Sequence, residues 1–100
     1  MFELFFAAPA DKELKHLEES SGEEGLVKQI KKALGNLSNN PRHPSLQTHK
    51  FYGYSNPYDD HEPVFEAYAQ QHTPGAARIL WCYGPKKKQI TLLAIIAHPE

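Results

Sequence analysis

Residues 77–100 have the sequence ARILWCYGPKKKQITLLAIIAHPE. Two apolar stretches, 77–83 and 89–97, flank a glycine–proline–lysine segment that is typical of a tight turn, so we expect two adjacent antiparallel strands. The second stretch is apolar almost throughout, which indicates a strand in the interior of the sheet. Arg78 and His98 interrupt this apolar pattern. Antiparallel pairing across the turn predicts that these two residues lie close together, at the end of the strands away from the turn.

The first forty residues predict one strand and two helices. Residues 2–8 are mostly apolar and indicate a short buried strand, and Pro9 suits the first position of a following helix. A second helix is predicted to begin near Ser21, because the spacing from Ser21 to Glu24 is that of a capping box. The apolar side chains that then recur at helical intervals are Leu26, Ile30, Leu34 and Leu37. Two helices in tandem with a short link predict a helical hairpin that buries one face.

The period of the sequence changes after Pro41. Residues 47–54 allow a short strand, residues 55–63 have the composition of a loop, and residues 64–70 alternate as a strand does. A turn then leads into the strand pair described above. The order is β-α-α-β-β-β, which predicts a two-layer α+β fold with an antiparallel sheet packed against the helical hairpin. The length of 100 residues predicts a single domain over residues 1–100.

The composition limits the classes of function. The formal net charge of −1 gives no global attraction to nucleic acid, so such binding needs a local basic patch. Basic residues gather at 42–50 and at 86–88. The longest apolar run is far shorter than the ~18 residues of a membrane span, so we expect no membrane association. The single cysteine, Cys82, fits a reducing cytoplasm.

The histidines do not indicate a metal site. His43 and His49 are separated by five residues, and His61 directly follows two aspartates, but neither arrangement has the spacing of a zinc site. The chain also has no glycine-rich phosphate loop and no nucleophile motif. We therefore expect neither a metal nor another cofactor.

The order of the elements and three stretches of the sequence resemble the RelE/ParE superfamily of bacterial toxins, which belong to type II toxin–antitoxin systems. NPRHPSLQTHKFYG is similar to the link that leads into the sheet in that family, and ARILWCYG is similar to its arginine-bearing strand. ITLLAIIAHPE is similar to its closing strand, which commonly ends in a histidine or a basic residue. The resemblance covers essentially the whole chain. It implies the RelE/ParE-like fold and a cytoplasmic toxin whose partner is a small antitoxin protein.

Within the ribonuclease branch of that family, the resemblance implies a metal-independent endoribonuclease that cleaves messenger RNA, mostly on the ribosome. Attack by a ribose 2′-hydroxyl needs a base, an acid and a fixed cation beside the phosphate. By position, Arg78 would clamp the phosphate and His98 would act as the acid or the base. Glu66 stands where some members of the family have a lysine, and it would serve as a base, as carboxylates do in other branches. Tyr68 shares a strand face with Glu66. The residues expected to hold RNA are Lys50, Tyr68, Lys86, Lys87 and Lys88.

Structural alternatives stay open for these residues. Arg78 can equally form an ion pair with Glu66 or Asp60, and His98, as the penultimate residue, can be without a role. Aromatic side chains on the strands can stack on bases, but a place in the core is expected for Trp81. The alternative function is a noncatalytic, protein-binding relative: either a ParE-like inhibitor of DNA gyrase or a degenerate toxin that only binds an antitoxin. A histidine after the last strand favours the ribonuclease.

Overall fold

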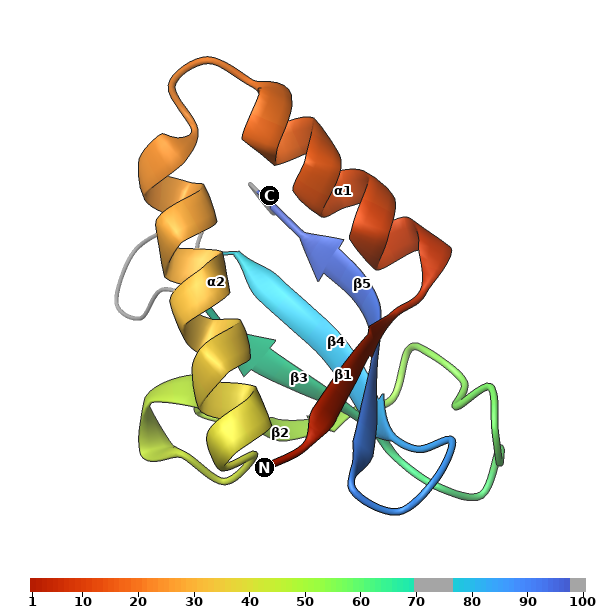
Figure 1. The fold of residues 1–100 in the computed structure, drawn as a ribbon. Coiled ribbons are helices and arrows are strands. Elements are labelled where there is room, and N and C mark those ends of the chain that lie inside the picture. The colour runs from red at the N-terminus through yellow and green to blue at the C-terminus, as the bar shows by residue number, and fades with distance from the viewer. Residues whose placement is uncertain (70–76, 98–100) are drawn as a thin grey trace.

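The computed structural model describes residues 1–69 and 77–97. The chain runs through eight elements within these residues (Figure 1). In order, they are β1 (Glu3–Phe6), α1 (Ala8–Glu19), α2 (Glu24–Asn39), the 3₁₀ helix η1 (Pro44–Leu46), β2 (His49–Phe51), β3 (Val64–Tyr68), β4 (Arg78–Tyr83) and β5 (Gln89–Ile96). The predicted α+β fold is confirmed. Four strands follow the helices and not the predicted three, because the short strand that residues 47–54 allowed is present as β2. Neither α-helix in this part of the chain is long and apolar enough to cross a bilayer.

The five strands form one sheet in the order β1-β5-β4-β3-β2. The prediction that the closing strand lies in the interior is confirmed, since β5 is hydrogen-bonded to both β1 and β4. Strands β2 to β5 form the expected antiparallel run, whereas β1 pairs with β5 in parallel. Parallel neighbours need a crossover connection. The route from β1 to β5 provides it, because the helices and the other strands lie between these two in the chain.

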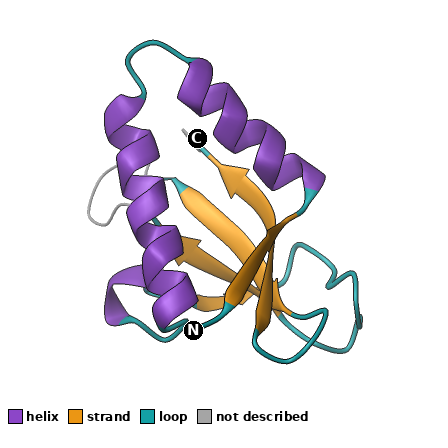
Figure 2. Cartoon of the chain, viewed as in Figure 1, coloured by secondary structure: helices purple, strands orange, loops and turns teal. Residues whose placement is uncertain are grey.

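Both helices cover the same face of the sheet, as Figure 2 shows. Their buried apolar residues, which include Ile30 and Leu37 of α2, form one core cluster with alternate residues of the strands. On β4 these alternate residues are Ile79 and Trp81, which are 0% and 1% exposed. Trp81 therefore belongs to the core, as the sequence predicted. Burial of this apolar surface is the main stabilising contribution to the fold.

A smaller apolar cluster lies on the opposite face of the sheet. It consists of Val64, Leu80, Cys82 and Leu93, all almost fully buried. A β-bulge in the β4–β5 pairing, between Leu80 and Trp81, shifts the register there. The loop of residues 52–63 contacts the turn end of this hairpin, because the Tyr58 hydroxyl lies 2.8 Å from that of Thr91. This loop is thus anchored at the end of the sheet far from Arg78.

One local prediction was wrong. The capping box at Ser21 does not start α2, whose first residue is Glu24 and whose N-cap is Glu23. The intervening Gly22 has a φ of +87°, a left-handed conformation that suits glycine and continues the interhelical turn past Ser21. The first helix begins at Ala8 with Pro9 in its first turn, one residue from the predicted start.

Candidate active site

The candidate site is centred on Glu66, which projects from β3 on the face that the helices leave uncovered. The Glu66 side chain is only 4% exposed. Strand β2 pairs with β3 so that His49 lies directly opposite Glu66. His49 Nε2 is 2.8 Å from Glu66 Oε1, and His49 Nδ1 is 3.2 Å from the carbonyl oxygen of Gln47. Both ring nitrogens of His49 therefore face oxygen acceptors, and each nitrogen donates a hydrogen bond when it carries a proton.

Arg78 of β4 contacts the other oxygen of the same carboxylate. Arg78 Nη1 lies 3.6 Å from Glu66 Oε2, close enough for an ion pair but longer than a hydrogen bond. The guanidinium carbon also lies 5.6 Å from the ring centroid of Tyr68, a cation–π contact. Tyr68 in turn lies 5.7 Å from the His49 ring. Four side chains from three adjacent strands therefore form one connected cluster.

This cluster contains polar atoms that the described part of the chain leaves unsatisfied. Glu66 Oε2 and Arg78 Nε are buried and have no hydrogen-bond partner among residues 1–69 and 77–97. Such atoms are rare in native proteins, because a buried polar group without a partner loses its hydrogen bonds to water and gains none from the protein. The Arg78 side chain is nevertheless 42% exposed, so part of its guanidinium remains open to a ligand. The arrangement suits an anion that would bind Arg78.

The chemistry available here is acid–base chemistry beside a fixed cation. Glu66 can accept a proton, an imidazole can donate or accept one near neutral pH, and Arg78 can bond two phosphate oxygens at once. Cys82 offers no nucleophile, because burial raises the pKa of its thiol to about 11. Among the described residues, no group of three or more His, Cys, Asp or Glu side chains could hold a metal ion.

Comparison with solved structures gives the same architecture over the whole chain. The YoeB/ParE toxin from Agrobacterium tumefaciens matches with a TM-score of 0.70 and 9% identity, covering 98% of this chain and 100% of that one. A chain of the intact RelBE toxin–antitoxin complex of E. coli matches with a TM-score of 0.64 and 15% identity over the full length of both chains. The chain has the RelE-like toxin fold.

The similarity in fold is accompanied by low sequence identity in the other comparisons as well. A metal-bound toxin from Helicobacter pylori has a TM-score of 0.66 and 20% identity, with 98% of this chain and 96% of that chain covered. No protein-family model matches the sequence, and no curated protein matches it. The similarity to the RelE-like fold is therefore one of structure, with little identity in sequence.

The RelE-like fold brings some of the predicted site residues together. Glu66, Arg78 and Tyr68 meet in the cluster, and the ion pair that was the structural alternative for Arg78 forms with Glu66. The other suggested partner, Asp60, instead lies 3.8 Å from His61 Nε2. His98 lies outside the described residues. Ile96, which precedes His98 by two residues in the chain, is the cross-strand partner of Arg78.

The predicted RNA-binding lysines lie away from this cluster. Lys86, Lys87 and Lys88 are in the β4–β5 turn, and Arg78 is at the other end of β4, roughly 16 Å away at about 3.3 Å per strand residue. Lys50 follows His49 on β2, so their side chains point to opposite faces of the sheet. It lines a pocket with Phe65 and Trp81, which belong to the helix-covered face.

Sequence reasoning missed His49. Its position in a short alternating stretch gave no sign of which strand it would pair with, because the long loop of residues 52–63 leaves the register between β2 and β3 open. The one available signal was the alternation itself, which places His49 and Phe51 on the same face. The contact with Glu66 becomes visible only in the folded register.

Proposed function

We propose that this protein is the cytoplasmic toxin of a toxin–antitoxin pair and that it cleaves messenger RNA without a metal ion. The observation that carries the proposal is the buried Glu66 carboxylate, held between His49 and Arg78 on the open face of the sheet. A carboxylate, an imidazole and a guanidinium supply the base, acid and phosphate clamp that RNA cleavage by its own 2′-hydroxyl requires. The RelE-like fold, shared with toxins of solved toxin–antitoxin complexes, supports the same assignment.

In the proposed reaction, the 2′-oxygen of a ribose attacks the adjacent phosphorus while the bond from phosphorus to the 5′-oxygen breaks. The products are a 2′,3′-cyclic phosphate and a 5′-hydroxyl. Glu66 takes the proton from the 2′-hydroxyl. Arg78 neutralises charge on the phosphoryl oxygens, and the absence of a hydrogen bond between Arg78 Nη1 and Glu66 leaves its guanidinium free to turn toward the phosphate.

The leaving 5′-oxygen needs a proton, and two histidines are candidates. His49 already contacts Glu66 and is about half exposed. His98 follows Ile96 by two residues, and two extended residues span at most ~7 Å, so the chain can bring an imidazole to the Arg78 end of the sheet. Substituting each histidine by glutamine distinguishes them. Substitution of the histidine that acts as the acid should lower the rate of cleavage by ~10²-fold or more, and substitution of the other histidine should lower it much less.

The test in cells is induced expression followed by primer-extension mapping of messages. The parent chain should produce new 5′ ends, and Glu66→Gln should abolish them while the protein stays folded. Glu62→Gln removes an exposed carboxylate from the 52–63 loop and serves as the matched control. If Glu66→Gln cleaves messages as well as Glu62→Gln does, the proposed site is wrong. If the parent cleaves nothing but binds an antitoxin, the noncatalytic alternative replaces the ribonuclease.

The proposed antitoxin has a suitable surface at the free edge of β1. Phe5 and Phe6 are 38% and 40% exposed there, and β1 is hydrogen-bonded to β5 on one side only. Exposed aromatic residues on a strand edge favour the docking of a partner segment. We expect co-expression with the product of the adjacent gene to give a complex that survives purification. Phe6→Glu should weaken that complex, and separate elution of the two parent proteins at micromolar concentration would contradict the pairing.

A further inference from the structure

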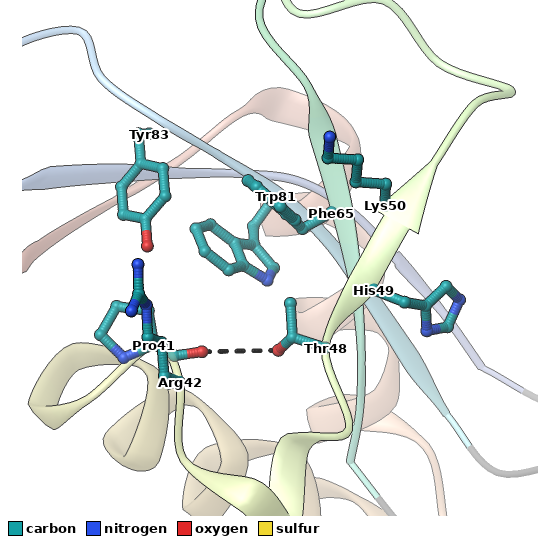
Figure 3. A pocket seen from close by; sticks show the side chains of 8 residues that line it. All are labelled: Pro41, Arg42, Thr48, His49, Lys50, Phe65, Trp81 and Tyr83. Atoms are coloured by element: carbon teal, nitrogen blue, oxygen red, sulfur yellow. Dashed lines mark hydrogen bonds between the residues drawn. The ribbon is translucent and has the colours of Figure 1, made fainter.

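A second candidate site lies between the sheet and the segment that follows α2. It is a pocket of about 340 Å³ beside the short edge strand β2 (Figure 3). Aromatic residues of β3 and β4 line it, together with two cationic side chains, Arg42 and Lys50. The volume is at the low end of the range for small-molecule sites, which fits one nucleotide better than two.

Three aromatic rings form one wall of the pocket. Phe65 stacks on Trp81 with ring centroids 4.8 Å apart, and the Tyr83 ring meets Trp81 edge-on at 4.9 Å. Trp81 is 1% exposed, whereas Tyr83 is 44% exposed. Tyr83 therefore keeps free ring surface beside a rigid aromatic base. A flat heterocycle can stack there, since stacking on an aromatic ring accepts any base.

The charge of the pocket is positive. Arg42 and Lys50 are both exposed, and neither has an acidic partner within ion-pair distance among the described residues. Within the same residues, no aspartate or glutamate lines the pocket. This local excess of cations contrasts with the net charge of −1 for the chain. Two cations without an acidic partner among residues 1–69 and 77–97, beside an aromatic wall, favour a ligand that is both flat and anionic.

The pocket also contains an unsatisfied donor. Trp81 Nε1 is buried and has no hydrogen-bond partner in the described part of the chain. In Figure 3 the indole nitrogen is on the side of the ring that faces Thr48. The Thr48 hydroxyl donates only a long hydrogen bond of 3.5 Å to the Pro41 carbonyl, so a small rotation of this side chain costs little. A ring nitrogen or carbonyl of a base would then satisfy the indole N–H.

We propose that this pocket binds a nucleotide. Its base stacks on Tyr83 and Phe65, and its phosphate is held by Arg42 and Lys50. The assignment of this pocket to the ribonuclease rests on the proposed function. His49 contacts Glu66 and also lines this pocket, so an RNA strand that reaches the active site can place a neighbouring nucleotide across β2. A free nucleoside monophosphate has the same chemistry and is the other source.

The pocket contains the only tryptophan of the chain, so the fluorescence and the indole N–H NMR signal of Trp81 report on it directly. We expect adenosine 5′-monophosphate to change both signals saturably. Adenosine and inorganic phosphate, each of which lacks half of the contacts, should bind at least ~10-fold more weakly. Arg42→Ala should weaken nucleotide binding at least ~10-fold. Lys32→Ala, which removes an exposed cation from α2, is the matched control and should change nothing.

The inference is overturned if millimolar nucleotide leaves both signals unchanged, or if Arg42→Ala binds it as well as Lys32→Ala does. A response to an acidic peptide without a response to nucleotide overturns it equally. A 2′-O-methyl RNA oligonucleotide that binds more tightly than the monophosphate supports an RNA strand as the source, and the reverse order supports the free nucleotide. Arg78→Ala should stop RNA cleavage while the Trp81 response persists. Cleavage without a Trp81 response contradicts only the pocket, and a Trp81 response without cleavage contradicts only the ribonuclease.

Discussion

On the face of the sheet that the helices cover, alternate strand residues such as Ile79 and Trp81 pack against α1 and α2 in a continuous apolar core. On the opposite face, the same strands carry a small apolar cluster and, directly beside it, the charged pair of Glu66 and Arg78. The two sets of residues alternate along the same strands. Because neighbouring side chains point to opposite faces, one sheet can hold a stabilising core on one face and a polar site on the other.

The largest effect on stability is expected on the helix-covered face. Leu37 of α2 is fully buried in the core cluster, so Leu37→Ala should lower the free energy of unfolding by about 2–5 kcal/mol. Cleavage per folded molecule should not change, because the proposed site around Glu66 lies on the other face. Urea unfolding combined with activity corrected for the folded fraction measures both. A loss of activity beyond the unfolded fraction would mean that the two faces are coupled.

The opposite result is expected for Arg78. Arg78→Ala removes the proposed phosphate clamp and should lower the rate of cleavage by ~10²-fold or more. Its midpoint of thermal unfolding should stay close to that of the parent, because the side chain is partly exposed and forms no hydrogen bond with Glu66. Arg78→Lys should recover only part of the rate, since a lysine cannot bond two phosphate oxygens in one plane. If Arg78→Lys recovered the full rate, a positive charge alone would be sufficient and the two-oxygen clamp would be contradicted.

Cys82 reports whether water is excluded from the apolar cluster on the opposite face of the sheet. Burial raises the pKa of its thiol from the ordinary 9.0 to about 11, so the unfolded chain ionises at a lower pH than the folded one. The contribution of the neutral thiol to stability is therefore complete below pH 9 and falls as the pH rises toward 11. The difference in unfolding free energy between the parent and Cys82→Ala, measured across this range, isolates the effect. A difference that does not change with pH would mean that water reaches this cluster.

The smallest effect is expected for the stability of Glu66→Gln. The substitution removes a buried negative charge, and a carboxylate oxygen that lacks a hydrogen-bond partner within the described residues is also lost. The lost contacts with His49 and Arg78 are offset by the lower cost of burying a neutral amide. The free energy of unfolding should therefore fall by less than about 1 kcal/mol, or rise. Thermal unfolding measures this. A large destabilisation would show that Glu66 holds the sheet together.

The sequence predicted the helix-covered face better than the opposite face. The periods of α2 and the unbroken apolar run of β5 identify the core because burial acts on each element independently. The site depends instead on register between strands, which the long loop of residues 52–63 leaves undetermined, and so His49 was missed. Arg78 was singled out because an arginine in an apolar strand is costly to bury without a partner, whereas Glu66 was suggested by the family resemblance. The start of α2 was misplaced because Gly22 prolongs the interhelical turn.

The central claim is that the site built on Glu66 and Arg78 cleaves RNA by attack of the RNA's own 2′-hydroxyl on the adjacent phosphate. The most direct test identifies the ends of the products after the purified protein acts, in EDTA, on single-stranded RNA and on messages bound to ribosomes. We expect 2′,3′-cyclic phosphate and 5′-hydroxyl ends, no cleavage of RNA that carries a 2′-deoxyribose at the cut site, and no products with Arg78→Ala. Products with 3′-hydroxyl and 5′-phosphate ends, or cleavage that EDTA stops, would contradict the claim.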